Sequence, residues 1–406
     1  MKKMTGDEDL ERARTEIARL LLEQCSQGRQ TTSLPSEMAA CGQFIGGDAA
    51  RRSQRGAHGT AAALTVLGTL HSVQSTALVC RVLKYMEREW LESNSMDEPN
   101  HDKTNVIKIA ETLLAVLKIP PGVASTENLA RNLAERLKKS KKNGPGWAYF
   151  TDGSDGVIDE LPTAFALRAL AAYGSDDLVP IAEYLLKRVT DAAGSLAVEN
   201  NSDIYVHTFS LFVLSHSDIR GLSAPVSDYK KAFSAIWNRL SAIRENVEQN
   251  LEYWKDENKS FYVRVPWQLY LLALAAKLGS KRVLTNVATE ARITSLVTEV
   301  NSKKGFRYPH SGDVPSSRTN AILYEILGLV KMARQQSQWL PALRALNAMG
   351  EAMNSRIATW AVSVVAAAVI GYSIYAWVMD PTKTIGDLAG EFLSVILLAL
   401  LHRRNA

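Results

Sequence analysis

The chain has 406 residues, of which 46% are apolar and 22% are charged, and this balance excludes a largely disordered protein. Its formal net charge is only +5, and its densest basic run (Lys138, Lys139, Lys141 and Lys142) closes a helical segment, where cations suit the negative end of the helix dipole. We therefore expect a globular protein that does not bind nucleic acid.

The first segment, residues 1–40, is predicted to form a helix and a linker. Its opening residues, 1–12, are polar and charged and lack the apolar core of a signal peptide, so we expect no secretion. The three cysteines, Cys25, Cys41 and Cys80, are odd in number and irregular in spacing, which argues against a disulfide framework and a closed zinc site. These features predict a reducing, cytosolic environment, with no bound metal and no cofactor.

Residues 41–335 contain six helix-patterned runs that are apolar nearly all round, which predicts that they are buried. Each run opens on small or polar residues and continues with Ala and Leu at helical spacing. The six runs begin at His58, Lys103, Glu160, Tyr205, Tyr262 and Ser316. More amphipathic, charged helices are predicted between them, over 76–91, 126–139, 177–189 and 229–246. Strand signals are almost absent, so the expected fold class is all-α.

Matching positions in the six runs recur every 44 to 59 residues, at Thr60, Thr104, Thr163, Thr208, Val265 and Thr319. One buried and one amphipathic helix per unit is typical of stacked helical hairpins, which form either an open superhelix or a closed ring. Six units favour closure into an (α/α)6 toroid with the buried helices inside, although the spacing alone does not distinguish the two forms.

Two of the units resemble the repeats of the prenyltransferase and squalene-cyclase toroids in more detail. Gly144–Gly174 contains a Gly-Trp turn, a short acidic loop and a Thr-Ala inner helix, and Lys303–Val330 follows the same plan. The other four units match only through their inner helices. The resemblance implies a toroid fold over about residues 40–335, whereas activity has to be argued from the site residues.

In such a ring the N-termini of the inner helices would converge at one end of a central cavity. The ligand-binding candidates at this end are His58, Tyr205, Tyr262, Arg264, Arg318, Trp147 and Tyr308, and their predicted neighbours are Asp159, Glu160, His207, Tyr149, His310 and Asn320. Helix N-termini and arginines favour anions, so a phosphate or carboxylate ligand is one hypothesis. Each residue also has a structural interpretation, since acidic residues cap helices, histidines form local hydrogen bonds, and Trp147 would pack in its turn.

The sequence does not carry the chemistry of the catalytic toroids. The nearest match to the DxDD-type acid motif of the triterpene cyclases is Val157–Glu160, in which the first Asp is missing. The zinc site of the protein prenyltransferases needs a Cys at an inner-helix opening, whereas Cys80 falls in an amphipathic segment. No catalytic residue or metal ligand is therefore assigned. Asp159, Glu160 and His207 are the candidates if the protein is an enzyme.

A connecting helix is predicted over residues 336–355, followed by a membrane hairpin over 356–406. Residues 357–378 hold no charge and would form roughly 33 Å of helix, enough to cross a hydrocarbon core of about 30 Å. A second segment, over about 385–401, includes Glu391, an ionisable residue that is costly inside a bilayer and often functional there. A half-inserted helix is the alternative for this segment. Basic residues at both ends of the hairpin favour the inner membrane, with the N-terminal domain in the cytoplasm.

Two classes of function stay open. The first is a membrane-anchored binding module for a partner protein or a small anionic or apolar ligand. Its hairpin would contact membrane lipids and form a homo-oligomer, as in a membrane-acting effector of a bacterial defence system. The motivation is the pairing of a ring lacking catalytic signatures with a short hairpin that carries Glu391. The second is a membrane-associated enzyme of the terpene-cyclase or prenyltransferase type, acting on isoprenoid, lipid or glycan substrates. We expect the first class.

Overall fold

The structure, a computed structural model, describes most of the first 352 residues. The described residues are 6–27, 34–42, 57–70, 72–92, 105–141, 144–151, 157–195, 201–216, 218–219, 231–232, 234, 251–256, 259–264, 267–277, 287–303, 305–306 and 316–352. The chain separates into two compact units, Met1–Gln335 and Gln336–Ala406. Both predicted membrane segments, with Glu391, lie outside the described residues. Among the helices that are described, none is both long enough and apolar enough to cross a membrane.

The described part of the chain is mostly helical, as predicted. The apolar runs form α3 (Ala57–Leu67), α5 (Val106–Leu117), α7 (Glu160–Tyr173), α9 (Asn201–Leu214), α12 (Trp267–Lys277) and the start of α15 (Ser317–Ala352). The more polar helices are α1 (Asp7–Gln27), α4 (Val73–Glu87) with the π-helical turn η1 (Arg88–Glu92), α6 (Glu127–Ser140), α8 (Val179–Ser195) and α14 (Val287–Lys303). The last apolar run and the predicted connecting helix are therefore joined in one long helix, α15.

One predicted helix is wrong at its start. The run expected to be helical from Tyr262 begins instead in a β-hairpin, in which β1 (Leu251–Asp256) pairs antiparallel with β2 (Lys259–Arg264). Aromatic and β-branched residues favour a strand here, and Pro266 disfavours a helical conformation in the residue that precedes it. Tyr262 and Arg264 therefore lie in β2 and not at the opening of a helix.

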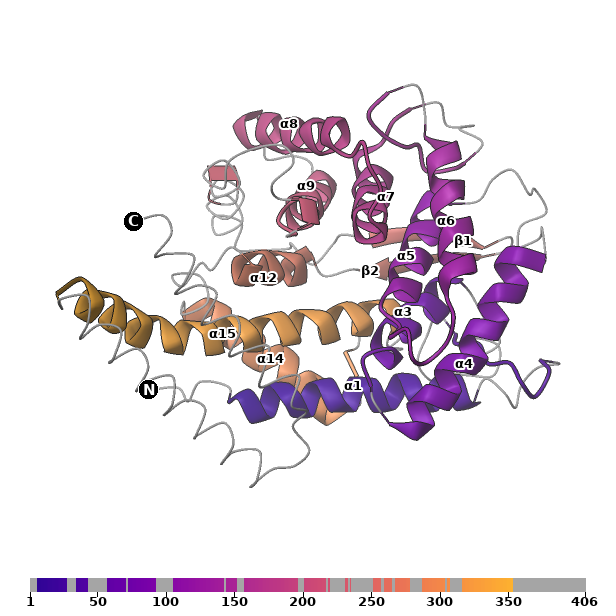
Figure 1. Cartoon of the computed structure of the whole chain (residues 1–406), viewed down its shortest axis with the longest axis horizontal. Coiled ribbons are helices and arrows are strands. Elements are labelled where there is room, and N and C mark those ends of the chain that lie inside the picture. Colours follow the sequence, from indigo (N-terminus) through magenta and orange to yellow (C-terminus); the bar gives the residue numbers. More distant parts are fainter. Residues whose placement is uncertain are drawn as a thin grey trace. The chain divides into compact units, whose positions relative to one another are not determined.

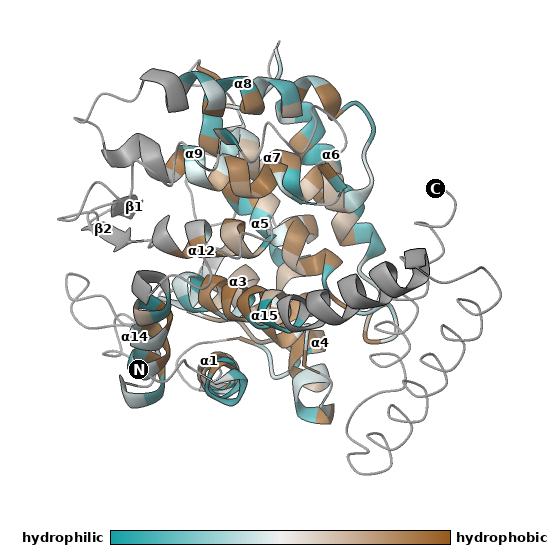
Figure 2. Ribbon diagram, turned by 90° about the vertical axis from the view of Figure 1, so that its left-hand side faces the viewer, coloured by the Kyte–Doolittle hydropathy of each residue, from teal (hydrophilic) through white to brown (hydrophobic). Residues whose placement is uncertain are grey.

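The helices are arranged in two layers. Successive apolar helices pack side by side, α3 on α5, α5 on α7, α7 on α9 and α9 on α12 (Figure 1). The amphipathic helices cover them, with α4 on α3, α6 on α5 and α7, and α8 on α7 and α9. Hydrophobic residues predominate in α3, α5 and α7, whereas α6 and α8 carry more hydrophilic ones (Figure 2). Burial of the apolar helices between their neighbours supplies the main driving force for this arrangement.

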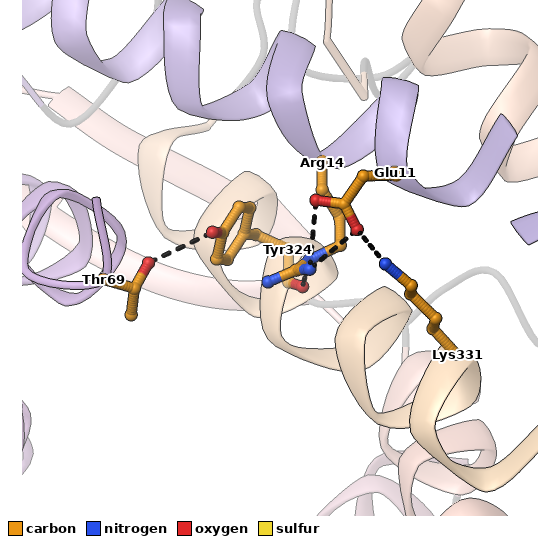
Figure 3. A network of polar contacts seen from close by, with 5 residues as sticks. All are labelled: Glu11, Arg14, Thr69, Tyr324 and Lys331. Atoms are coloured by element: carbon orange, nitrogen blue, oxygen red, sulfur yellow. Dashed lines mark hydrogen bonds and ion pairs between the residues drawn. The ribbon is translucent and has the colours of Figure 1, made fainter. Parts of the chain in front are cut away.

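Helix α15 joins the last apolar run to the first segments of the chain. The Ser317 hydroxyl lies 2.7 Å from the carbonyl oxygen of Gly42 and 2.9 Å from the side-chain oxygen of Gln24 on α1. Two turns further along α15, the Tyr324 hydroxyl lies 3.1 Å from the hydroxyl of Thr69, just after α3 (Figure 3). These contacts bridge 255 to 293 residues of sequence, so the two ends of the first unit meet.

A hydrogen-bonded clamp recurs at the start of three apolar helices. In each, one side chain in the first turns of the helix bonds both the N–H and the C=O of a residue in the preceding segment. The pairs are Thr60 with Cys41, Thr163 with Trp147, and Asn320 with Phe306. The distances from the backbone nitrogen to the clamping oxygen are 3.3, 3.0 and 2.9 Å respectively. Thr60 and Thr163, two of the predicted repeat positions, thus make the same clamp. In the last unit the clamp is made by Asn320, one residue after the predicted position Thr319.

The structure overturns the expectation of no disulfide. Cys25, near the end of α1, is bonded to Cys41, which lies in the segment before α3. Their Cα atoms are 4.6 Å apart, within the range that a disulfide spans. The odd cysteine count was misleading because Cys80 is simply the free one. Such bonds are rare in reducing compartments, so the cysteines give no support to the expected reducing environment.

Candidate functional site

Three groups of ionisable side chains lie between the apolar helices. The first is at the start of α7, where the buried carboxylate of Glu160 lies 3.0 Å from Nδ1 of His207 on α9. The guanidinium of Arg188 on α8 approaches the same carboxylate at 3.9 Å. Asp159 serves as the cap of α7, because its Oδ1 accepts the backbone N–H of Leu161 at 3.0 Å. The structure therefore brings two of the three catalytic candidates together and gives the third a structural task.

The second group is an ion pair between α15 and α5. Arg318 Nε donates to Glu111 Oε1 at 2.7 Å, and both side chains are largely buried. The guanidinium carbon of Arg318 also lies 5.5 Å from the centre of the Phe165 ring on α7. The contact with the ring adds a cation–π attraction to the ion pair. Arg318, predicted to bind a ligand, is thus fixed between three helices by charge and by aromatic contact.

Four aromatic rings fill the space between α7, α9 and α12. Phe209 is at the centre, with its ring 4.3 Å from Phe165, 6.3 Å from Phe212 and 4.9 Å from Tyr270. Each of the four residues is at most 3% exposed. Tilted and edge-to-face rings at these separations attract one another beyond the effect of burying their area. The aromatic layer is therefore a packed part of the core.

The third group surrounds Glu325 of α15. Arg168 of α7 donates to one carboxylate oxygen of Glu325 at 2.7 Å, and the ammonium of Lys118, which follows α5, lies 3.5 Å from the other. The side chain of Arg168 is mostly enclosed, whereas those of Lys118 and Glu325 keep 33% and 27% of their surface exposed. One carboxylate therefore serves two cations at a place that solvent can reach.

Further polar groups gather around the ring of Phe212. The ammonium of Lys277, at the end of α12, and the guanidinium carbon of Arg168 each lie 5.3 Å from its centre. The ring of His216, just after α9, meets Phe212 edge-on at 5.0 Å. We refer to Lys118, Arg168, His216, Lys277 and Glu325, with Phe212, as the cationic cluster.

The charges in the cationic cluster shift one another's pKa values. Burial, followed by the charge of Arg168, lowers the pKa of Lys277 to about 8 and the pKa of His216 to about 2. Burial alone would raise the pKa of Glu325, but the charges of Arg168 and Lys118 outweigh it and hold that pKa well below its ordinary value. At neutral pH, Glu325 is therefore ionised, His216 is neutral and Lys277 is charged.

The structure describes the remaining predicted ligand-binding residues only in part. Trp147 is fully buried and its indole N–H donates to the carbonyl of Leu137 at 2.8 Å, so it packs in its turn. His58 lies in the first turn of α3, and Tyr205 lies one turn inside α9, because that helix begins four residues earlier than predicted. Tyr308, with His310, lies outside the described residues.

Sequence reasoning missed the cationic cluster because it considered only the openings of the apolar helices. A usable signal was present in Arg168, the one charged residue of α7 after Glu160, and in Glu325, which stands in another apolar run. A charge in a run that is buried nearly all round must find a partner or remain costly. Lone charges in the apolar helices therefore indicate the cationic cluster better than the residues at the helix openings do.

The cationic cluster and the Glu160–His207 pair support different chemistry. Several donors around an excess of positive charge can hold an anion, whereas a carboxylate and an imidazole in contact can move a proton. In the described part of the chain, no group of three His, Cys, Asp or Glu side chains is placed to hold a metal ion.

No protein-family model matches the chain, and a search of curated proteins found no match either. The interpretation of both groups therefore depends on their geometry.

Proposed function

We propose that the chain is a membrane-anchored binding module, in which a ring of six helical hairpins recognises a small ligand or a partner protein and acts on a C-terminal membrane hairpin. The observation that carries this proposal is the course of α15. Near its start, Arg318 and Glu325 are bonded to α5 and α7, and the same helix continues to Ala352, shortly before the predicted span at 357–378. We propose that α15 couples the ion pairs of Arg318 and Glu325 to the predicted membrane segment.

Three features support a closed ring. The apolar helices from α3 to α12 each pack on the next one along the chain. Helix α15 is hydrogen-bonded to Thr69, which follows α3, so the last apolar run meets the first. The recurring clamps show that at least three units share one local plan, as stacked repeats do.

The aromatic layer and the ion pairs between the apolar helices favour binding over terpenoid catalysis. An enzyme that folds an isoprenoid chain needs an open apolar cavity, with a carboxylic acid kept neutral at one end. Between the described parts of α5, α7, α9, α12 and α15 lie instead the aromatic layer and the Arg318–Glu111 and Arg168–Glu325 ion pairs. Glu325 is moreover held in its ionised form.

One observation favours an enzyme as the second candidate. Glu160 and His207 form a buried carboxylate–imidazole pair, which is a common arrangement for proton transfer. If the pair is catalytic, Glu160→Gln would abolish turnover while the chain stayed folded. If the pair is structural, the same substitution would change stability alone.

Expression of the full chain in bacteria tests the proposed function. We expect the protein in the membrane fraction, with loss of membrane potential and of growth after induction. Glu391→Leu should abolish the loss of membrane potential, because the carboxylate inside the predicted hairpin is removed. Asp387→Leu is the matched control, since Asp387 stands near the start of the predicted second segment, where we expect the membrane interface, and it should leave the effect unchanged. Recovery of the chain in the soluble fraction, or equal activity of both variants, would contradict the proposal.

A further inference from the structure

We propose that the cationic cluster is a binding site for an anion, specifically for the phosphate group of a small molecule. The cluster lies where α5, α9 and α12 end and α7 and α15 pass. It deepens the proposed function by naming a ligand class for the module.

The first argument is the balance of charge. Lys118, Arg168 and Lys277 are three basic side chains, and Glu325 is the carboxylate bonded within the cluster. Burial lowers the pKa of Lys118, and the charge of Glu325 opposes that lowering. Asp218, which is exposed, attracts Lys277 from the margin. With its three basic groups protonated, the cluster proper holds two positive charges more than negative ones, and an anion between them would offset their mutual repulsion.

The second argument concerns polar atoms whose hydrogen bonds are not made. Among the described residues, the ammonium of Lys277 has no hydrogen-bond acceptor, and its close contact is with the face of the Phe212 ring. The Nε2 atom of His216 is buried and has no hydrogen-bond partner in the described part of the chain. The unpaired Nε2 atom costs free energy because it is buried, and the Lys277 ammonium at the same ring is a donor that an anion would engage.

The third argument identifies the ligand. A guanidinium offers a planar fork of donors that matches phosphate oxygens, and two ammonium groups add compact positive charge. A phosphate with two negative charges would balance the excess of the cluster, which a single carboxylate would not. The exposed portions of Lys118 and Glu325 leave the edge of the cluster open, so a ligand could enter without unfolding the core.

A structural explanation for the same cations also exists. Lys118 and Lys277 stand at the C-termini of α5 and α12, where positive charges complement the helix dipole. That explanation does not extend to Arg168, which lies within α7 with more than a turn of helix on either side. The two explanations also predict opposite results for the protein without ligand. Removal of a lysine that complements a helix dipole lowers stability, whereas removal of a lysine that is repelled by neighbouring cations does not.

Thermal unfolding of the full chain in detergent micelles tests the proposal, with chloride added to keep ionic strength constant. The probes are inorganic phosphate, AMP and glycerol 3-phosphate, which separate a free anion, a nucleotide and a lipid headgroup as the source of the phosphate. We expect the Tm to rise with at least one of them, as for any ligand that binds only the folded state.

Three variants make the result specific. Lys277→Met keeps the apolar stem of the side chain. It should raise the apparent Kd for phosphate at least about tenfold, and its Tm in chloride should not be lower than that of the parent chain. Lys139→Met is the matched control, since it removes an exposed lysine from the end of α6, and it should bind as the parent does. Glu325→Gln should lower the Tm in chloride, and phosphate should raise the Tm of this variant by more than it raises the Tm of the parent chain.

Each contrary outcome is distinct. No Tm shift with any of the three probes overturns the proposal, and so does an equal shift in the parent chain and Lys277→Met. A lower Tm of Lys277→Met in chloride with an unchanged phosphate response would assign Lys277 to the helix end alone. These measurements detect binding and not membrane activity. They can therefore contradict the anion site without contradicting the proposed membrane function, and the membrane experiment can contradict that function without contradicting the anion site.

Discussion

Arg14 and Tyr324 are 310 residues apart in the sequence and in direct contact in the structure. The guanidinium carbon of Arg14 lies 4.3 Å from the centre of the Tyr324 ring, and Arg14 Nε donates to the Tyr324 carbonyl at 3.3 Å (Figure 3). Glu11 accepts from Arg14 and from Lys331 on either side of this contact. Helix α1 is thereby fixed along α15, so the N-terminal helix is part of the folded unit.

The Arg14–Tyr324 contact can be tested by stability measurements. Arg14→Ala should lower the free energy of unfolding by about 1–2 kcal/mol, because it removes a cation–π contact and a hydrogen bond. Arg12→Ala, two residues away on the solvent side of α1, should change it by less than about 0.5 kcal/mol. Chemical denaturation of the two variants gives the comparison, and equal effects would show that α1 is not fixed by this contact.

The turn before α7 leaves no room for a side chain at Gly146. A Cβ atom there would lie 2.5 Å from Ile158 and 2.6 Å from the clamping hydroxyl of Thr163. Gly146→Ala should therefore destabilise the fold by about 1–3 kcal/mol through overpacking. The control is Gly122→Ala, whose Cβ would meet nothing within 4 Å and which should be nearly neutral in a thermal melt. If both variants melt alike, the clamp is looser than its distances indicate.

Asp159 and Glu160 should respond differently to substitution, although they are adjacent. Asp159→Asn keeps a good N-cap and should be almost neutral, whereas Asp159→Ala should cost about 1 kcal/mol. Glu160→Gln and His207→Gln should be coupled, with an interaction energy of about 1 kcal/mol or more in a double-mutant cycle. Additive effects would mean that the Glu160–His207 contact contributes no free energy of its own.

The ionisation of Lys277 should make stability depend on alkaline pH. Because its pKa is lowered to about 8 in the folded protein and its ordinary value is 10.5, the unfolded chain binds the extra proton between these values. The free energy of unfolding should therefore rise with pH over this range, relative to Lys277→Met. The charged and titratable groups facing Lys277 are Lys118, Arg168, His216, Asp218 and Glu325. A flat difference between parent and variant from pH 7 to about 10 would show that the pKa is not lowered.

The Cys25–Cys41 disulfide should contribute about 3 kcal/mol to stability, because the two residues are 16 positions apart and the closed loop restricts the unfolded chain. Reduction with dithiothreitol should lower the Tm of the parent chain and leave that of Cys41→Ser unchanged. Cys80→Ser removes the free thiol and should melt as the parent does under both conditions. A parent chain indifferent to reductant would indicate that the two cysteines are thiols in solution.

Much of the secondary structure could be predicted because its causes are local. Apolar residues at helical spacing and short capping signals lie within a few positions of one another, as with Asp159 before α7. The sequence thus determined a mostly helical protein with alternating apolar and amphipathic helices. The interpretation of Asp159 as a cap and of Trp147 as a packing residue followed from the same local reasoning, and the structure confirms both.

Only the tertiary structure decided which distant residues meet. Arg168 and Glu325 are 157 positions apart, and nothing within either apolar run specifies that the two charges share one site. The Cys25–Cys41 bond and the contact of α1 with α15 depend in the same way on the return of the chain to its beginning. Local propensity fixes the period and ends of each helix, whereas the pairing of buried charges is fixed by packing among all of them. The cationic cluster is therefore visible only after the helices have been brought together.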